Sequence, residues 1–247
     1  MIRRIKVCVN GGRSAGVPVT PAQLAAEAAA AVAAGAEAVH LHPRGPDGAE
    51  TLTAPAVGAA VAAVRESCPG VPISVTTGLW ITGGDPARRL ELVRAWAELP
   101  APHRPDLASV NLGEDRFADT VAVLERAGVA VEAGVWSEQD ARRLGATPVE
   151  KILVEVVQTP ATEAVGVADR LLARLDREGA GAPRLLHGEE EACWPLIRHA
   201  GRLGLPTRIG LEDTLADDTG APAGGNAALV RRALAVWESE RAAGQVQ

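Results

Sequence analysis

The stretch TPAQLAAEAAAAVAAGAEAVHLH, residues 20–42, contains the pattern from which the fold can be inferred. Thr20 suits the N-cap of a helix and Pro21 its first position, and the Ala-rich run that follows extends to about Ala34. Gly35 ends the helix, and residues 36–42 favour a strand that finishes with two histidines. The stretch therefore predicts one helix followed directly by one strand.

The same alternation of strand and helix continues along the rest of the chain. We expect strands at residues 5–10, 36–42, 72–76, 106–111, 129–134, 150–156, 184–187 and 207–211, and helices at residues 21–34, 54–67, 86–97, 115–127, 137–144, 162–178, 189–203 and 226–241. Eight such pairs in 247 residues predict an α/β fold, a (β/α)8 TIM barrel in which residues 1–247 form a single domain. A doubly wound sheet is the alternative, although it would usually need fewer repeats for this length.

The composition favours a small molecule as the binding partner. Hydrophobic residues make up 47% of the chain, with no Tyr and one Phe, so the core must consist of small aliphatic side chains. The net charge is −6, and the basic residues are scattered singly along the sequence. This distribution provides no basic patch for nucleic acid and argues against binding to an anionic membrane surface.

The cysteines and the N-terminal residues indicate a cytoplasmic protein. Cys8, Cys68 and Cys193 lie far apart without any CxxC spacing, so we expect reduced thiols that act as small buried residues. A strand begins almost at the first residue, and no stretch approaches the roughly 20 apolar residues of a membrane span. We therefore expect a soluble protein.

The two histidines of residues 36–42 are the first candidate for a functional site. Residues i and i+2 of a strand point to the same face, so His40 and His42 can bind one object together. Two neutral imidazoles side by side are a favourable beginning for a Zn²⁺ site, which needs one or two further ligands. The alternative is a pair of hydrogen-bonded histidines at a strand end without a metal.

Polar side chains stand at the ends of nearly all the predicted strands. Catalytic groups of (β/α)8 barrels lie at the C-terminal ends of the strands, so these side chains are expected to converge. They are Asn10, His40, His42, Ser74, Thr76, Ser109, Asn111, Glu132, Glu155, His187, Arg208 and Glu212. Four pairs have even spacing, so both members of each can face one lumen: His40/His42, Ser74/Thr76, Ser109/Asn111 and Arg208/Glu212. The alternative is that loops are hydrophilic in general, which accounts for part of the set.

The segment RIGLED, residues 208–213, supplies the second candidate cluster. The eighth strand is expected to close the barrel beside the first, which places Glu212 two strands from the histidine pair and makes it a candidate third metal ligand. Asp213 follows directly and can act as a base. A surface cluster of ion pairs is the alternative interpretation of this segment.

These segments, taken together, resemble the β-keto acid cleavage enzymes. The resemblance covers most of the chain and rests on VNGGR at residues 9–13, residues 19–48, ISVTTG at 73–78, DLASVNLG at 106–113 and RIGLEDT at 208–214. Residues 19–48 and the RIGLED segment are its most specific parts. By this resemblance His40, His42 and Glu212 correspond to zinc ligands, Asp213 to the catalytic aspartate, Arg208 to the arginine that assists it, and Thr76 to a hydroxyl position of the substrate site, with Ser109 and Asn111 near the bound keto acid. We add Glu132 to the substrate-binding residues from its place at a strand end.

The resemblance also implies a reaction and its partners. The family carries out a retro-Claisen exchange in which a β-keto acid and an acyl-CoA, usually acetyl-CoA, give acetoacetate and a new CoA thioester. Zn²⁺ held by the keto and carboxylate oxygens would stabilise the enolate as a Lewis acid. Barrels of this family commonly assemble, so a homo-oligomer is expected.

Two loops depart from the family pattern. The family has a Gly-rich loop after the sixth strand and a GxGxxQ-like turn after the seventh, both expected to help bind CoA. Here residues 158–162 read QTPAT and residues 187–191 read HGEEE. Three acids would repel a CoA pyrophosphate, although they also suit the first turn of a helix. Two alternatives therefore remain, a zinc-dependent lyase or aldolase that uses no CoA, and a catalytically silent barrel that binds a metal and an acid.

Arg13 leads to an expectation about the charge of the substrate. By the resemblance, the family member that cleaves 3-keto-5-aminohexanoate carries a glutamate in the loop after the first strand, and this glutamate pairs with the ammonium group of the substrate. Arg13 stands at the corresponding place in this chain. An arginine there would bind a carboxylate with two parallel hydrogen bonds and repel an amine. We therefore expect a substrate whose far end is anionic or neutral, unless Arg13 points to solvent from its Gly-rich loop.

Overall fold

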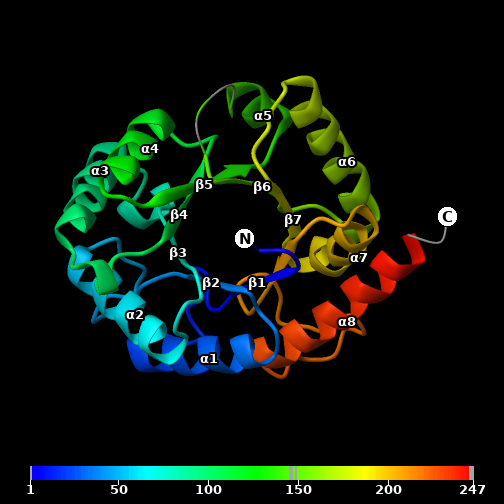
Figure 1. The fold of residues 1–247 in the computed structure, drawn as a ribbon, viewed down its shortest axis with the longest axis horizontal. Coiled ribbons are helices and arrows are strands. Elements are labelled where there is room, and N and C mark those ends of the chain that lie inside the picture. Colours follow the sequence, from blue (N-terminus) through cyan, green and yellow to red (C-terminus); the bar gives the residue numbers. More distant parts are fainter. Residues whose placement is uncertain (1, 145–146, 148, 245–247) are drawn as a thin grey trace.

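Eight parallel strands surrounded by helices form the molecule in the part of the chain that is described (Figure 1). The structure is a computed structural model that describes residues 2–144, 147 and 149–244. The strands are β1 (Ile5–Cys8), β2 (Ala38–Leu41), β3 (Ile73–Thr76), β4 (Leu107–Asn111), β5 (Ala130–Val135), β6 (Lys151–Val156), β7 (Arg184–Gly188) and β8 (Thr207–Ile209). The helices are α1 (Pro21–Ala33), α2 (Ala54–Ser67), α3 (Pro86–Arg94), α4 (Phe117–Arg126), α5 (Glu138–Leu144), α6 (Ala161–Arg177), α7 (Cys193–Leu203) and α8 (Asn226–Gly244). The predicted (β/α)8 barrel is confirmed.

The sheet closes where β8 meets β1. Its strand order is β7-β6-β5-β4-β3-β2-β1-β8, and Lys6 of β1 lies opposite Arg208 of β8. Gly210 directly follows β8, and a Cβ atom at this position would overlap the carbonyl group of Cys8. On the other side of β8, the Leu186 amide donates to the Pro206 carbonyl at 3.0 Å. The eighth strand therefore lies two strands from β2, as the sequence predicts.

Helix α1 begins where its capping residues predict. The Thr20 side chain accepts a hydrogen bond from the Gln23 amide, and the Gln23 side chain accepts one from the Thr20 amide, so that two unpaired amides of the first turn are satisfied. Leu24, Ala28 and Ala31 lie on one face of the helix at spacings of three and four residues, and all three are fully buried. The small side chains allow α1 to pack closely against the barrel.

Two predicted helices have different ends in the structure. The helix expected at residues 86–97 is α-helical only to Arg94 and continues as a 3-10 turn, Ala95–Glu98. The helix expected at residues 189–203 begins only at Cys193, after a separate 3-10 turn, Glu190–Ala192. Pro195 fits only the first turn of an α-helix because it lacks an amide hydrogen, and Glu190 has a φ of 50°. The three acids at 189–191 therefore precede α7 and do not form its first turn.

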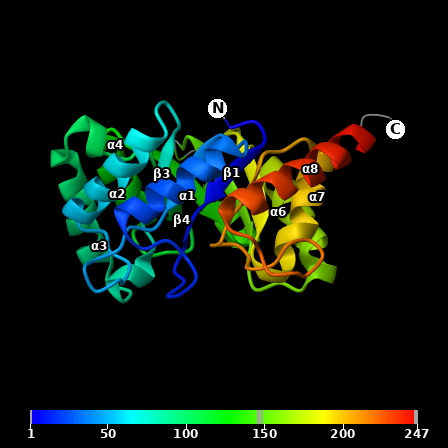
Figure 2. The same cartoon turned by 90° about the horizontal axis from the view of Figure 1, so that it is seen from below.

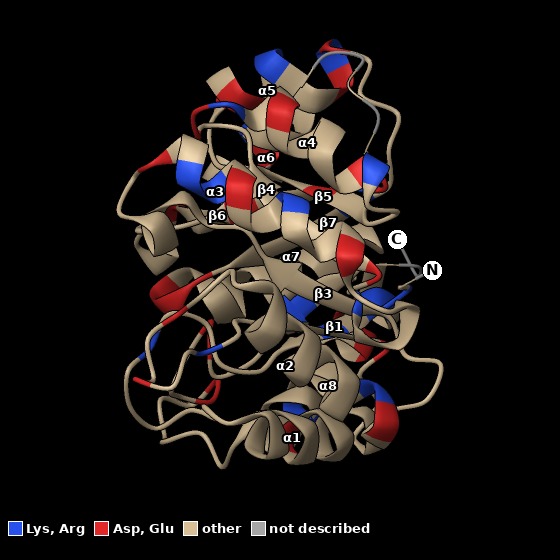
Figure 3. Ribbon diagram, turned by 90° about the vertical axis from the view of Figure 1, so that its left-hand side faces the viewer, with Lys and Arg blue, Asp and Glu red and all other residues tan. Residues whose placement is uncertain are grey.

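The two edges of the barrel differ in their loops. Figure 2 shows the loops after β1 and β8 (blue and orange) projecting from one edge, whereas the C-terminal end of α8 lies at the opposite edge. Figure 3 shows acidic and basic residues interspersed on the helices of the face in view, without a basic stripe. All three cysteines are free and buried. Among the described residues, no helix combines the length and the apolar character that crossing a membrane requires.

Candidate active site

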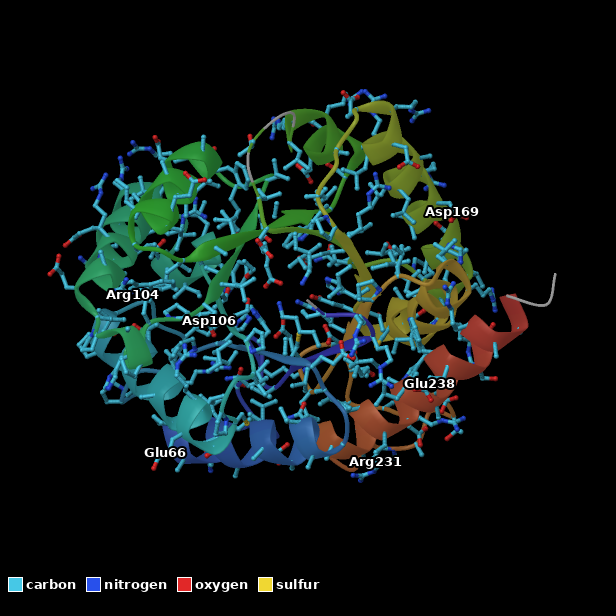
Figure 4. The ribbon with its side chains drawn as sticks, viewed as in Figure 1. Glu66, Arg104, Asp106, Asp169, Arg231 and Glu238 are labelled. Atoms are coloured by element: carbon cyan, nitrogen blue, oxygen red, sulfur yellow. The ribbon has the colours of Figure 1, made fainter. Side chains whose placement is uncertain are left out.

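A cavity of about 250 Å³ lies at the C-terminal ends of the strands. Side chains fill the inside of the ring of strands, whereas the labelled Glu66, Arg231 and Glu238 lie on the outer helices (Figure 4). The cavity is lined by Gly12, His40, His42, Thr76, Trp80, Ser109, Asn111, Trp136, Glu155, Val157, Gln158, Glu189, Arg208 and Glu212. Residues that lie on or shortly after each of the eight strands thus contribute to one site.

Three side chains form a cluster with metal-ligand geometry. The Nε2 atoms of His40 and His42 lie 3.2 Å apart, and Oε2 of Glu212 lies 4.0 Å from the first and 3.5 Å from the second. Among the described residues, this buried Oε2 atom has no hydrogen-bond partner. Two imidazole nitrogens and an unpartnered carboxylate oxygen facing one point fit a divalent cation that prefers nitrogen and oxygen ligands.

The outer nitrogen of each imidazole is held by a neighbouring side chain. Nδ1 of His42 lies 2.5 Å from Oε1 of Glu50, and Nδ1 of His40 lies 3.0 Å from Oγ of Ser74. The Ser74 hydroxyl in turn donates to Glu132 at 2.6 Å. Such partners fix the orientation of metal-binding imidazoles, so both Nε2 atoms are directed toward Glu212.

Burial and neighbouring charges shift the pKa values of all three side chains in the cluster. Burial lowers the pKa of His42, but the Glu212 and Glu50 carboxylates outweigh burial and raise it to about 9. Burial, aided by the neighbouring positive charges, lowers the pKa of His40 well below its usual value, against the effect of the Glu212 carboxylate. Burial raises the pKa of Glu212, but Arg208 and the histidines hold it well below its usual range. The site therefore favours a positive charge between the imidazoles and the carboxylate.

Arg208 joins the metal cluster to two further carboxylates. Its guanidinium lies 3.0 Å from Glu212, 2.8 Å from Asp213 and 3.4 Å from Glu189. Burial and the Glu212 carboxylate raise the pKa of Asp213 well above its usual range, in spite of Arg208. Burial raises the pKa of Glu189 to about 7, again against the effect of Arg208. Two carboxyl groups with raised pKa values thus share one arginine.

The predicted site residues do not all reach the cavity. Thr76, Ser109, Asn111, Arg208 and the three members of the metal cluster line it, whereas Asp213 is fully buried behind Arg208. Asn111 donates its amide to Glu114 at 3.0 Å, which leaves its side-chain oxygen for the cavity.

Glu132 and Arg13 are engaged in contacts outside the cavity wall. Glu132 is fully buried inside the barrel, where it pairs with Lys6 and accepts the Ser74 hydroxyl. Arg13 pairs with Glu190 and donates to the Leu211 carbonyl at 2.7 Å, so it ties the loop after β1 to the loop after β8. The structure does not bring either side chain to the cavity.

Several cavity residues were missed by sequence reasoning. Trp80, Trp136, Gln158 and Glu189 all lie one to four residues beyond the end of a strand. The candidate site residues were chosen from strand ends, and the loops with Gln158 and Glu189 were considered only as departures from a CoA-binding pattern. Glu50, which holds His42, comes from the loop before α2. An extension of the search into the first residues of each loop would have included the four cavity residues.

A comparison with protein families places the chain. Residues 4–242 match the family model described as beta-keto acid cleavage enzyme. The chain belongs to this family. A curated relative, the 3-keto-5-aminohexanoate cleavage enzyme of Fusobacterium nucleatum, is 33% identical over 124 residues, which make up 49% of this chain and 44% of the relative. The match to this cleavage enzyme therefore spans less than half of the relative's length.

Solved structures share the barrel with this family member at low sequence identity. ObcA in a binary complex with oxaloacetate superposes with a TM-score of 0.66 at 17% identity, covering 93% of this chain and 63% of that one. The 3-dehydroquinate dehydratase from Geobacillus kaustophilus superposes with a TM-score of 0.65 at 15% identity, covering 96% of this chain and 91% of that one. These similarities show the fold alone.

Proposed function

We propose that this protein is a zinc-dependent β-keto acid cleavage enzyme that exchanges a β-keto acid with an acyl-CoA to give acetoacetate and a new CoA thioester. The observation that carries the proposal is the cluster of His40, His42 and Glu212, with its unpartnered Oε2 atom, beside Arg208 in a small cavity. Membership of the β-keto acid cleavage enzyme family supports the same chemistry. ObcA, which shares the fold, has been solved in a ternary complex with a C4-CoA adduct and oxalate.

The residues of the cluster suit zinc as the resident metal. His40, His42 and Glu212 would hold it as a His2Glu ligand set, which leaves room for substrate oxygens. Bound there, Zn²⁺ would supply Lewis-acid stabilisation of negative charge on the keto acid. Glu50 and Ser74 keep the two imidazoles oriented for this role.

The remaining groups bind the acid and move its proton. Thr76, Ser109 and Asn111 line the cavity and offer hydrogen-bonding groups to the keto acid. We assign proton abstraction to Asp213, a buried carboxylate whose Oδ2 atom has no partner among the described residues. Arg208 separates Asp213 from the cavity, so this assignment requires the guanidinium to turn toward the bound acid. In that position it would counter the negative charge that develops.

A lyase or aldolase that uses no CoA is the second candidate function. Glu189 lines the cavity, and Glu190 and Glu191 follow it with exposed side chains. Arg208 is the sole Lys or Arg among the cavity-lining residues, and it is already shared by three carboxylates. This distribution of charge is unfavourable for a CoA pyrophosphate at the mouth of the cavity.

One experiment separates the candidates. The zinc-loaded protein is incubated with a panel of β-keto acids, with and without acetyl-CoA, and acetoacetate and new thioesters are measured. Acetoacetate that forms only with acetyl-CoA, together with a new thioester, is the expected result. Cleavage that proceeds equally well without acetyl-CoA would favour the lyase. If no acid in the panel reacts under either condition, the proposed function is wrong.

A further inference from the structure

The cavity wall opposite the metal cluster carries an unassigned carboxylate. β6 and β2 lie four strands apart in the ring of eight, so they face each other across the barrel (Figure 1). Glu155, near the end of β6, is 5% exposed and lines the cavity. His40, His42 and Glu155 line the same cavity, so a keto acid held at the metal cluster would have Glu155 on the far wall.

Glu155 lacks a cationic partner. Its Oε2 atom accepts a hydrogen bond from the Trp136 indole at 3.0 Å and lies 3.7 Å from Nε2 of His187. Burial, assisted by Arg208, lowers the pKa of His187 to about 4, so the imidazole is neutral at neutral pH. Within the described part of the chain, no Lys or Arg lies within ion-pair distance of Glu155. A buried carboxylate in this state gains substantially from a cation that enters beside it.

Two acceptor oxygens converge above the backbone of Gly134. A Cβ atom at this position would overlap Oδ1 of Asn111 and would lie 3.1 Å from Oε1 of Glu155. Because the Asn111 amide nitrogen donates to Glu114, the oxygen is the Asn111 atom that faces this space. The absence of a side chain at Gly134 thus lets two acceptors meet at the cavity wall, where a ligand with several hydrogen-bond donors fits.

We propose that Glu155, Asn111 and Trp136 form a subsite for a primary ammonium group at the end of the β-keto acid that is remote from the metal cluster. The subsite rests on the proposed function, since the keto acid must be held at the opposite wall. An ammonium group has three donors and a positive charge, which match the acceptor oxygens of Asn111 and Glu155 and the negative charge of the Glu155 carboxylate. The indole of Trp136, which is 42% exposed, adds an aromatic surface beside the cation.

This inference reverses the expectation based on Arg13. That guanidinium is bound to Glu190 and to the Leu211 carbonyl, and it does not line the cavity. A substrate with a carboxylate at its far end would instead meet Glu155, and like charges in a partly buried site repel each other. The side chains that reach the cavity therefore favour a cationic group.

Four acids of equal chain length test the subsite. They are 3-keto-5-aminohexanoate, 5-hydroxy-3-ketohexanoate, 3-ketohexanoate and 3-ketoadipate, and kcat/KM is measured for each with the zinc-loaded protein. We expect kcat/KM for 3-keto-5-aminohexanoate to exceed that for 3-ketohexanoate at least about tenfold, because charge-assisted hydrogen bonds are strong. In Glu155→Gln this ratio should fall at least about tenfold, mainly through KM. The control Glu191→Gln removes an exposed acid outside the cavity and should keep the ratio.

A binding measurement decides the inference independently of turnover. Dissociation constants of the same acids are determined by calorimetry for the parent protein and for both variants. If no acid reacts, the proposed function fails, and the ratio of dissociation constants still tests the subsite. Equal affinity for 3-keto-5-aminohexanoate and 3-ketohexanoate would overturn the inference. So would tighter binding of 5-hydroxy-3-ketohexanoate or 3-ketoadipate than of 3-keto-5-aminohexanoate. An unchanged ratio in Glu155→Gln would overturn it as well.

Discussion

The Arg208 guanidinium is shared by Glu189, Glu212 and Asp213, so a change at one of these carboxylates affects the other two. Glu212 also faces the two histidines, which makes it part of the metal cluster, whereas Asp213 is buried on the other side of the arginine. Neighbouring residues in the chain thus have different environments. Substitutions can separate their roles, because metal content and turnover are measured independently.

Metal analysis of the purified protein should find about one Zn²⁺ per chain, since His40, His42 and Glu212 form one ligand set. The double variant His40→Ala/His42→Ala removes two of the three ligands, so its zinc content should fall close to zero. The matched control is His103→Ala, which changes a histidine with an exposed side chain away from the cavity. Full zinc occupancy in the double variant would show that the metal is bound elsewhere.

Asp213→Asn should lower kcat at least about 100-fold, because it removes the base and nearly preserves the shape of the side chain. Zinc content should stay unchanged, since Asp213 faces Arg208 and not the two histidines. Steady-state kinetics and metal analysis on the same preparation provide the two readouts. Turnover close to that of the parent protein would remove Asp213 from the mechanism.

His187 should make the free energy of unfolding depend on pH. Burial lowers its pKa from 6.5 to about 4 in the folded protein, so the unfolded chain binds a proton between these values and the folded one does not. The contribution to stability is present above pH 6.5 and is lost as the pH falls toward 4, by about 3 kcal/mol. Urea unfolding at pH 7 and pH 4 measures the loss.

His187→Leu should lack this part of the pH dependence. Neither ring nitrogen of His187 has a hydrogen-bond partner among the described residues, so an apolar replacement leaves no new unpaired group at this position. The parent protein should therefore lose about 3 kcal/mol more than the variant between pH 7 and pH 4. An equal loss in both proteins would mean that the folded protein does not keep His187 neutral.

At the scale of single elements, capping differs between the helices. Thr20 and Thr53 are the N-cap residues of α1 and α2, and both precede a helix with Pro in its first turn. Thr20 forms a capping box with Gln23, whereas the Thr53 side chain caps no amide of its helix. The same residue type therefore has different energetic importance at equivalent positions.

Thr20→Ala should reduce the free energy of unfolding by about 1 kcal/mol, the usual effect of losing a side-chain cap. Thr53→Ala is the matched control and should lower the free energy of unfolding by only a few tenths of a kcal/mol. Urea denaturation of both variants at one temperature provides the comparison. Equal losses would indicate that the capping box does not stabilise α1.

The positions of helices and strands could be predicted from the sequence. The level at which a side chain lies along the inside of the barrel could not. Proline and glycine positions located the helices and strands, apart from the end of α3 and the start of α7, where Glu190 takes a φ of 50°. The place of Glu132 at a strand end made it a candidate substrate-binding residue, but did not show that it lies beside Lys6, outside the cavity wall. That level depends on how neighbouring strands are staggered, which a single strand does not encode. The partners of Arg13 likewise come from loops that are distant in sequence.

At the scale of the whole molecule, the barrel depends on the contact between its last and first strands. Gly210→Ala would push a methyl group into the Cys8 carbonyl and should cost about 3 kcal/mol, as overpacking of a closed contact does. Gly181→Ala is the control, since nothing lies within 4 Å of its Cβ position. Thermal unfolding monitored by circular dichroism should show a large decrease in Tm for the first variant only. Similar Tm values for both would mean that the contact tolerates a side chain.

The position of Trp80 gives the protein an internal optical reporter. Its ring lies over Gly78 and is stacked on His42, with 6.3 Å between the ring centroids. The chain contains no tyrosine and five tryptophans, so a Trp80→Phe variant isolates the part of the emission that comes from Trp80. A protonated imidazole quenches the fluorescence of a neighbouring indole, and a metal ion on that imidazole displaces the proton. Occupancy of the cluster can therefore be followed as a change in tryptophan emission, without a dye or a coupled assay.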